Sequence, residues 1–430
     1  MPVSVAIIGG GYAGMAAAAT LAEHGLAVSV FEAAQQLGGR ARRVDWNGIA
    51  LDNGLHILIG AYRETLRLVA LVNPDADSAL RRLPFDWHIH RRFRLRAAPL
   101  PAPWHLALGL LSARGAGFGE RMAAVAFMRA LHGSGFRLEQ DITVSELLRR
   151  HRQGADITRH LWHPLCIAAL NTPPDIASAR VFLNVLRDSL STTRADSEIL
   201  LARTDLSALF PDPAADFVRA RKGQVLTAHA VDAITARDGG FTLQVRGQPL
   251  HFTRIVCALP PHRLATVTAG LPELGAATAM AGQFRYQPIY TVYLQYPEET
   301  VLPAAMLGMP AGLAQWVFDR GMLCGQAGLV AAVISAAGPH QNMTQDELAQ
   351  RVHGELQQQF GALPDPRWQR VIAEKRATFA CVANLQRPAQ RTPLKNFYLA
   401  GDYTGNEYPA TLEAAVRSGV ACARHILESL

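Results

Sequence analysis

Apolar and alanine-rich stretches at the start of the chain predict a parallel β–α–β unit. Residues 3–8 are apolar and rich in β-branched side chains, which is typical of a buried parallel strand. The stretch from Ala13 to about His24 predicts a helix that ends at Gly25, and Val28–Phe31 predicts a second strand.

The pattern that follows divides the chain into alternating blocks. Asn47-Gly48 predicts a hairpin turn between two short strands. Residues 76–214 have apolar positions at helical spacing and predict mainly helices and loops, whereas residues 215–265 return to strands. Residues 283–380 are rich in β-type runs with one amphipathic helix, and a strand and a helix with small residues close the chain. We therefore expect two interleaved domains.

Length and composition support a two-domain globular protein. The chain has 430 residues, which exceeds the usual size of a single core. Hydrophobic residues make up 49% and charged residues 18%, which excludes a disordered chain. The five cysteines are odd in number and widely spread, so we expect free thiols in a cytoplasmic setting, with no disulfide framework and no metal site. Because the first predicted strand begins at Val3, we expect no cleaved leader.

The net charge of +7 comes almost entirely from arginine and is unevenly distributed. Six arginines crowd into residues 81–96, and the apolar run AAPLPAPWHLALGLL follows them. That run is interrupted by prolines and is shorter than the roughly 18 residues of a spanning helix. Basic residues beside an apolar, Trp104-containing helix favour a segment in the membrane interface, and a solvated basic loop is the alternative. Nucleic acid is a weaker alternative, because no motif for binding it accompanies the charge.

A glycine-rich turn after the first strand predicts a bound dinucleotide. Gly9, Gly11 and Gly14 have the spacing at which the backbone turns tightly, approaches a pyrophosphate and packs the next helix against the strand. The amide groups at the start of that helix, near Ala13, would face the phosphates. Glu32 follows the second strand and would accept hydrogen bonds from a ribose, while repelling a 2′-phosphate.

This start of the chain resembles a known superfamily once the next residues are included. After the glycine turn and Glu32 comes LGGR, and the combination is similar to the FAD-binding start of the amine oxidase and phytoene desaturase superfamily. The resemblance implies FAD rather than NAD, with Gly39 and Arg40 along the pyrophosphate. It also implies that the backbone at Val231 meets the adenine.

The end of the chain resembles the closing FAD motif of the same superfamily. The segment YLAGDYTGNEYPATLEAAVRSG implies that Gly401 and Asp402 bind the phosphate and ribityl region of the flavin. A helix that begins near Leu412 would direct its positive end at the pyrimidine side of the ring.

Two longer stretches resemble a narrower family. They are LDNGLHILIGAYRETLRL from Leu51 and HPLCIAALNTPPDIASARVFLNVLRDSL from His163, and both are similar to the hydroxysqualene dehydroxylase family of bacterial hopanoid synthesis. The resemblance implies an isoprenoid substrate, hydroxysqualene, whose hydroxyl group is replaced by a hydride from reduced flavin. The acid that protonates the leaving hydroxyl is then expected at His56, with Asp52 as its orienting partner and Tyr403 as the rival proton donor.

The sequence thus predicts an α/β protein with a discontinuous Rossmann-like FAD-binding domain, residues 1–75, 215–265 and 385–430. An α+β substrate and membrane-contact domain, residues 76–214 and 266–384, is inserted in it. The expected location is the inner face of the cytoplasmic membrane. Oxidative desaturation of a polyprenoid or of an amine, and prenyl binding of the Rab escort type, are the alternatives on this fold. No second nicotinamide-binding motif appears, so the electron donor stays open.

Overall fold

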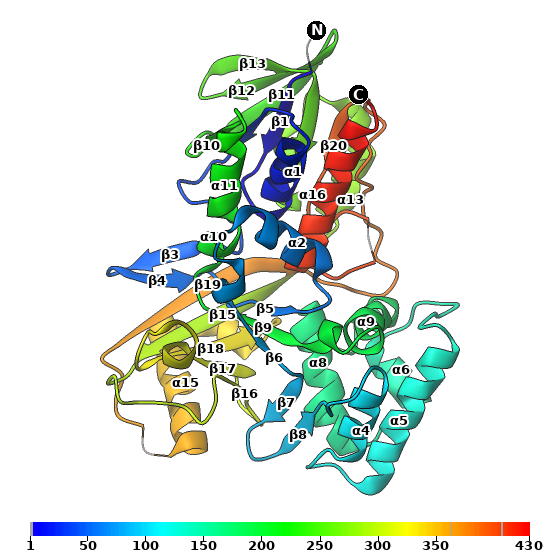
Figure 1. Ribbon diagram of the computed structural model, residues 1–430, viewed down its shortest axis with the longest axis vertical. Coiled ribbons are helices and arrows are strands. Elements are labelled where there is room, and N and C mark those ends of the chain that lie inside the picture. Colours follow the sequence, from blue (N-terminus) through cyan, green and yellow to red (C-terminus); the bar gives the residue numbers. More distant parts are fainter. Residues whose placement is uncertain (1–2, 362, 406) are drawn as a thin grey trace.

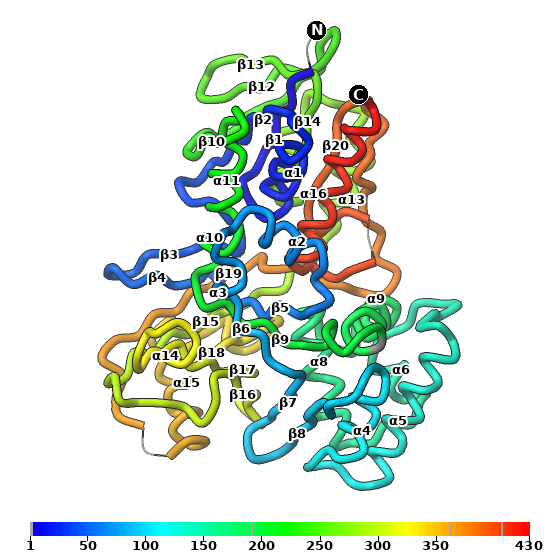
Figure 2. Tube along the Cα trace, in the orientation of Figure 1, coloured from blue at the N-terminus to red at the C-terminus, as the bar shows by residue number. Residues whose placement is uncertain are grey.

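A computed structural model describes residues 3–361, 363–405 and 407–430. The chain forms two lobes, which we call the nucleotide lobe and the substrate lobe (Figure 1). Both termini lie in the nucleotide lobe. The trace in Figure 2 shows that this lobe collects the blue start, a green middle segment and the red end of the sequence. The nucleotide lobe is therefore discontinuous in sequence.

A five-stranded parallel sheet forms the centre of the nucleotide lobe. Its strands, in spatial order, are β10 (Gln224–Leu226), β2 (Val28–Phe31), β1 (Val5–Ile8), β14 (Arg254–Cys257) and β20 (Phe397–Leu399). The order places β1 at the middle, as a Rossmann-like fold requires. Both faces of β1 are buried, which explains its continuous apolar sequence.

Helices cover one face of this sheet and a second sheet covers the other. The helices are α1 (Tyr12–Glu23), α2 (Arg63–Val72), α10 (Leu206–Leu209), α11 (Pro211–Ala220) and α16 (Leu412–Leu427). The antiparallel second sheet contains β11 (Val231–Arg237), β12 (Gly240–Val245) and β13 (Gln248–Phe252). Helices α12 (Pro261–Val267) and α13 (Gly275–Gly282) follow it in the chain.

Alternate residues of β1 enter different cores. Val5 and Ile7 pack with the helices, whereas Ala6 and Ile8 pack toward the second sheet. The small residues of α16 let it approach α1 closely, because a Cβ on Gly419 would lie 2.1 Å from the carbonyl oxygen of Ala13. This close contact explains why the packing face of α16 is built from small residues.

A seven-stranded mixed sheet forms the centre of the substrate lobe. Five of its strands come from residues 283–380, where a β-rich block was predicted, and two come from residues 86–96, in a block predicted to be mainly helices and loops. In spatial order its strands are β19 (Trp368–Phe379), β15 (Tyr286–Gln295), β18 (Leu329–Ser335), β17 (Trp316–Asp319), β16 (Met306–Gly308), β7 (Asp86–Ile89) and β8 (Phe93–Arg96). Only β16 and β7 pair in parallel among these described strands. The amphipathic helix α15 (Gln345–Phe360) packs on one face, and the short helix α14 (Arg320–Cys324) follows β17.

A group of helices, which we call the helical insert, lies beside the sheet of the substrate lobe (Figure 1). It contains α4 (Trp104–Leu111), α5 (Phe118–Gly133), α6 (Val144–Arg150), α7 (Ala155–Ile157), α8 (His163–Leu170) and α9 (Ala179–Leu186). Thr143 and Ser178 cap α6 and α9 through their hydroxyl groups. Among the described residues, none of the helices is both long and apolar enough to cross a bilayer.

Two smaller sheets connect the lobes. One is the hairpin of β3 (Arg43–Trp46) and β4 (Ile49–Asp52), in which Asn47 and Gly48 both have positive φ, as predicted. The other contains β5 (Ile57–Ile59), β6 (Leu80–Leu83) and β9 (Ile199–Ala202), and the short helix α3 (Ala76–Ala79) precedes β6.

The interpretation of the arginine-rich span as a basic loop was wrong. The span forms β6, β7 and β8, and in β8 the side chains of Phe93 and Leu95 are buried while Arg94 and Arg96 are exposed. This alternation has the period of a strand.

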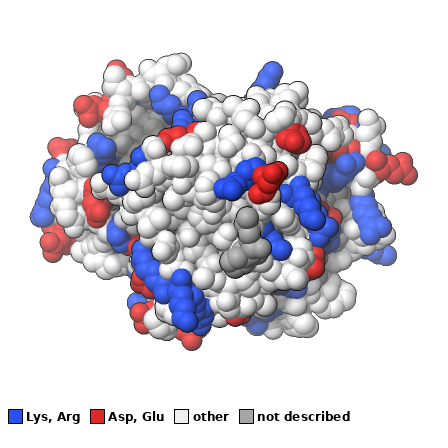
Figure 3. Space-filling view, turned by 90° about the horizontal axis from the view of Figure 1, so that it is seen from above, with Lys and Arg blue, Asp and Glu red and all other residues white. Residues whose placement is uncertain are grey.

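Figure 3, which looks down on the nucleotide lobe, shows acidic and basic groups interspersed over a largely uncharged surface. On that face the net positive charge is not gathered into one field.

Candidate nucleotide and active site

The glycine-rich turn between β1 and α1 has the shape that a close ligand requires. Gly9 has a φ of +108°, and a Cβ there would lie 2.7 Å from the carbonyl oxygen of Ala258. A Cβ on Gly14 would lie 1.9 Å from the Gly9 carbonyl oxygen, so α1 packs directly on the turn. Gly11 is the N-cap of α1, and no side chain of the described residues caps this helix. The first-turn amide groups, near Ala13, therefore remain for a phosphate.

Glu32 lies beside the same turn, at the end of β2. Its carboxylate accepts hydrogen bonds from the amides of Gly10, at 2.6 Å, and of Ala34, at 2.8 Å. These bonds fix the carboxylate while leaving lone pairs for a ribose hydroxyl. The segment before β11 passes this residue, because the His229 amide donates to the Glu32 carbonyl oxygen at 2.8 Å, and β11 then begins at Val231. The residues predicted for the ribose and the adenine are neighbours.

The GGR segment lies against the glycine turn. The Gly38 amide donates to the Gly10 carbonyl oxygen at 2.9 Å, and a Cβ on Gly39 would lie 3.3 Å from the Cα of Gly11. Because both residues are glycines, the two backbone segments touch, and both can line one pyrophosphate site. The glycine cradle, the uncapped helix and Glu32 together fit FAD.

Arg40 and Asp402 form an ion pair, although they are far apart in the sequence. The Arg40 Nη2 atom donates to the Asp402 carboxylate at 2.7 Å, and Nη1 donates to the Ala377 carbonyl oxygen at 2.8 Å. Asp402 is buried, whereas about a third of the Arg40 side chain is exposed. The structure thus brings into direct contact two residues that the resemblance assigned to FAD, Arg40 to the pyrophosphate and Asp402 to the phosphate and ribityl region.

The loop from Gly401 leads into α16. Gly401 donates its amide to the Ser418 hydroxyl at 2.7 Å, and the Thr411 hydroxyl caps α16 by accepting from the Ala414 amide at 3.2 Å. Leu412 is the first residue of the helix, as predicted, and is buried.

Glu413 is a buried residue that sequence reasoning missed. Its carboxylate accepts hydrogen bonds from the Thr65 amide at 2.9 Å and the Thr65 hydroxyl at 2.7 Å, and pairs with Arg417 at 2.7 Å. Glu413 therefore fastens the start of α2 to the start of α16. An acidic residue in the first turn of a helix, on its buried face, is the sequence feature that indicates such a contact.

Asp52 is buried at the end of β4 and pairs with Arg320. The Arg320 Nη1 atom donates to one carboxylate oxygen at 3.1 Å, and the Leu206 amide donates to the other at 2.9 Å. Burial raises the pKa of Asp52, against the opposing effects of Arg320 and of the Leu206 amide. Arg320 was not expected at the site, because nothing in its sequence neighbourhood links it to Asp52.

His56 is oriented by the backbone rather than by a carboxylate. Its Nδ1 atom lies 2.8 Å from the Gly54 carbonyl oxygen, which can only accept, so Nδ1 carries the proton and Nε2 has a lone pair in the neutral ring. Burial lowers the pKa of His56, and the charge of Arg40 lowers it further, while the bond to Gly54 opposes both. The predicted pairing of His56 with Asp52 is not what the structure shows, because the Asp52 carboxylate is engaged by Arg320 and Leu206.

Tyr403 lies in the core. The ring packs near Phe284, with 6.4 Å between ring centroids, and its hydroxyl has no hydrogen-bond partner among the described residues. Burial raises the pKa of Tyr403 well above its ordinary value, so the hydroxyl keeps its proton. Tyr403 lines neither the small cavity beside Asp52 nor the larger cavity in the helical insert.

Asp52, His56 and Arg320 line a small cavity between the lobes' connecting strands. The cavity has a volume of about 10 Å³, close to the space for one water molecule. Its other walls are apolar, with Leu55, Leu201, Leu206, Phe318 and Leu323 among them. The arrangement places a guanidinium, a carboxylate and an imidazole at the end of an apolar wall. Such a site has room for a single hydroxyl-sized group.

Known proteins match this chain over nearly its whole length. The model of the flavin containing amine oxidoreductase family matches residues 12–427. Hydroxysqualene dehydroxylase from Rhodopseudomonas palustris is 30% identical, covering 99% of each chain, and the enzyme of that name from Sinorhizobium fredii is 28% identical, covering 97% of each. The zeta-carotene desaturase of Solanum lycopersicum is 23% identical over 99% of this chain and 81% of its own.

Solved structures share the fold. Putrescine oxidase, in a triple mutant, has a TM-score of 0.71 at 15% identity, with both chains fully covered. Cyclohexylamine oxidase from Brevibacterium oxydans has a TM-score of 0.70 at 19% identity, with 99% of each chain covered. These likenesses agree with the predicted Rossmann-like α/β fold.

Proposed function

The chain belongs to the flavin-containing amine oxidoreductase family and is an FAD-dependent oxidoreductase, and we propose that it converts hydroxysqualene to squalene by reductive dehydroxylation. The observation that carries the proposal is the similarity, over 99% of both chains, to a hydroxysqualene dehydroxylase at 30% identity. The cavity that joins three polar groups to an apolar wall supports it. We place the reaction at that cavity.

The overall reaction consumes two electrons and two protons. The C–O bond of the allylic alcohol breaks, a C–H bond forms at the same carbon, and the hydroxyl group leaves as water. FAD, when bound and reduced, supplies the hydride. We propose that Glu32 and Val231 hold its adenosine half and that Gly9, Gly11 and Gly14 lie along its pyrophosphate. For the pyrophosphate and the flavin half we propose the residues Ala13, Gly39, Arg40, Gly401, Asp402 and Leu412.

The residues of the chain have to deliver one proton to the leaving hydroxyl. We assign this to His56 at Nε2, the ring nitrogen that the Gly54 carbonyl oxygen leaves without a proton in the neutral form. Because the pKa of His56 is lowered, the ring must first take up a proton from solvent, and it then holds that proton only weakly. A weakly held proton transfers readily to a poor leaving group. Asp52, with Arg320, would keep the cavity polar rather than orient His56.

Oxidative desaturation of a polyprenoid is the first alternative, and the similarity to a zeta-carotene desaturase supports it at lower identity. Amine oxidation is supported by the family model and by the folds of the two oxidases. Prenyl binding without chemistry, of the Rab escort type, is a further alternative on the same fold. The four differ in what they do to a substrate rather than in shape.

Product analysis distinguishes these possibilities. The purified protein, loaded with FAD and reduced with dithionite without oxygen, is incubated with hydroxysqualene, and in parallel the oxidised protein is incubated with squalene or putrescine in air. We expect squalene in the first reaction and no new product in the others. If the oxidised protein forms a more unsaturated polyprenoid or an aldehyde, the protein is an oxidase instead. If every substrate is recovered unchanged, the result supports a prenyl-binding protein without chemistry.

We also propose that the protein docks on a membrane surface through α4 and α5, at the inner face of the cytoplasmic membrane. Trp104 and Leu108 of α4 are 65% and 47% exposed, and Phe118 and Met122 of α5 are 68% and 45% exposed. Large apolar side chains grouped in this way favour contact with lipid. Of the nearby arginines, Arg94 pairs with Asp86 and is not free for lipid phosphates.

A further inference from the structure

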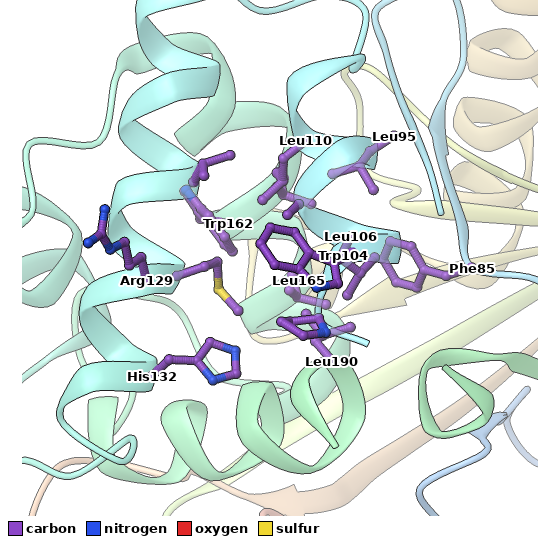
Figure 4. Close-up of a pocket in the computed structure, with 15 residues that line it drawn as sticks. Phe85, Leu95, Trp104, Leu106, Leu110, Arg129, His132, Trp162, Leu165 and Leu190 are labelled. Carbon is purple, nitrogen blue, oxygen red and sulfur yellow. The ribbon is translucent and has the colours of Figure 1, made fainter. Parts of the chain in front are cut away.

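A second, larger cavity lies inside the helical insert. It has a volume of about 340 Å³ and is enclosed by α4, α5, α8 and the strand β8. Phe85, Leu95, Leu110, Met128, Trp162 and Leu165 are among its walls. Figure 4 shows these aliphatic and aromatic side chains gathered around the space, with Arg129 and His132 of α5 at one side. Its volume is in the range of ligand-binding pockets, at the lower end.

The interior of this cavity offers almost nothing to a polar ligand. The indole N–H of Trp162 is already used, because it donates to Gln153 at 2.8 Å. Arg129 and His132 are exposed to solvent, and Arg129 turns its guanidinium away from the other lining side chains (Figure 4). A polar group moved from water into this space would lose its hydrogen bonds. The cavity therefore selects a hydrocarbon.

The lining of the cavity continues onto the exposed apolar surface of α4. Trp104, the first residue of α4, both lines the cavity and is largely exposed, and Ala107 follows one turn later in the wall. Leu108, next to Ala107 in the sequence, is exposed. Trp104 thus belongs both to the cavity wall and to the exposed apolar surface of α4.

Helix α8 connects the cavity with the nucleotide site. Leu165 of α8 lines the cavity, and the helix ends at Asn171, whose side-chain amide donates to the Thr378 hydroxyl at 3.0 Å. The carbonyl oxygen of Ala377, the neighbour of Thr378, accepts from Arg40. Eight residues of α-helix span about 12 Å. A fully extended squalene chain exceeds that length.

We propose that this cavity binds one isoprenoid arm of the substrate, while the remainder of the chain extends toward the flavin. The inference rests on the proposed function for the identity of the ligand, but not for the existence of the site. An isoprenoid arm and the acyl chain of a phospholipid are both aliphatic, so an acyl chain is the competing occupant of the cavity.

Filling the cavity tests the proposal. Ala107→Phe narrows it from α4 and Val125→Phe from α5, so that one variant serves if the other does not fold. Ala130→Phe, on the exposed side of α5 and outside the wall, is the matched control. FAD content and thermal melting establish that each variant is folded. Binding of radiolabelled squalene, delivered from cyclodextrin to the FAD-loaded protein, is then measured by gel filtration.

We expect one squalene per wild-type protein, and an affinity at least tenfold lower in Ala107→Phe and Val125→Phe. The Ala130→Phe control should bind as the wild type does. Unchanged squalene binding in a folded filling variant would overturn the proposal. So would displacement of squalene by an equimolar short-chain phosphatidylcholine, which would assign the cavity to acyl chains.

The two proposals fail in different ways. If squalene binding depends on the cavity but hydroxysqualene is not converted, the proposed reaction is wrong and the chain-binding site stands. If hydroxysqualene is converted at the wild-type rate and with the wild-type KM by Ala107→Phe, the reaction stands and the cavity is not the chain site.

Discussion

Removing the carboxylate of Glu32 should weaken FAD binding without unfolding the protein. In Glu32→Ala, the ligand loses a charge-assisted hydrogen bond from its ribose, which contributes about 1.5–3 kcal/mol. A tenfold change in affinity corresponds to about 1.4 kcal/mol, so the Kd should rise by roughly 10-fold to 150-fold. The amide of Gly10 also loses its acceptor, which loosens the glycine turn and adds to the effect. Asp402→Ala should act in the same direction, because it leaves Arg40 without its 2.7 Å partner.

The affinity is measured by titrating the apoprotein with FAD and following the quenching of flavin fluorescence. Glu23→Ala is the matched control, because Glu23 ends the same helix α1 and carries the same charge away from the turn. Glu32→Gln should fall between the wild type and Glu32→Ala, since an amide oxygen can still accept from Gly10. Wild-type affinity in folded Glu32→Ala and Asp402→Ala would refute the assignment of these residues to FAD.

Three further predictions concern the acid, the buried ion pair and the membrane. His56→Ala should bind FAD normally but lower kcat by about 10²-fold to 10⁴-fold. Because burial lowers the pKa of His56 from its ordinary value, the wild-type kcat should rise as the pH falls through that lowered pKa. A rise that persists in His56→Gln would contradict the role. Arg320→Met should lower the free energy of unfolding, measured in urea, by about 3–5 kcal/mol, because it leaves Asp52 buried without its partner. The double variant Asp52→Asn/Arg320→Met should lose less than the sum of the two single variants. Additive losses would show that the two residues are not coupled. In flotation with anionic liposomes at low salt, membrane affinity should fall at least tenfold in Arg91→Glu/Arg92→Glu/Arg96→Glu, because each arginine near the surface contributes about 1 kcal/mol. The control Lys222→Glu/Arg237→Glu/Arg246→Glu should bind as the wild type does. Equal loss in both variants would remove the proposed docking face.

Features set by neighbouring residues could be predicted from the sequence. The turn at Asn47-Gly48 depends on a few residues and was confirmed. The side-chain caps that Thr143 and Ser178 form are also local, because each joins residues three positions apart. The β1–α1–β2 unit is similarly local, since its strands, helix and glycines lie within about thirty residues. The glycine turn and Glu32 are adjacent for the same reason.

Contacts between distant segments could not be predicted in this way. Asp52 and Arg320 are 268 residues apart, and only the tertiary fold brings the end of β4 and the start of α14 together. The large cavity likewise arises where α4, α5 and α8 meet. The strands around Arg94 were missed for a different reason, because the charged side chains concealed the alternation of Phe93 and Leu95.

A single-turnover experiment tests the proposed reaction most directly. The FAD-loaded protein is reduced by one equivalent of dithionite, excess reductant is removed, and hydroxysqualene is added without oxygen while the flavin absorbance is followed and the products are extracted. We expect one squalene for each reduced flavin, formed at the rate at which the yellow oxidised flavin returns. Flavin that stays reduced in the presence of hydroxysqualene, or that reoxidises without forming squalene, would contradict reductive dehydroxylation.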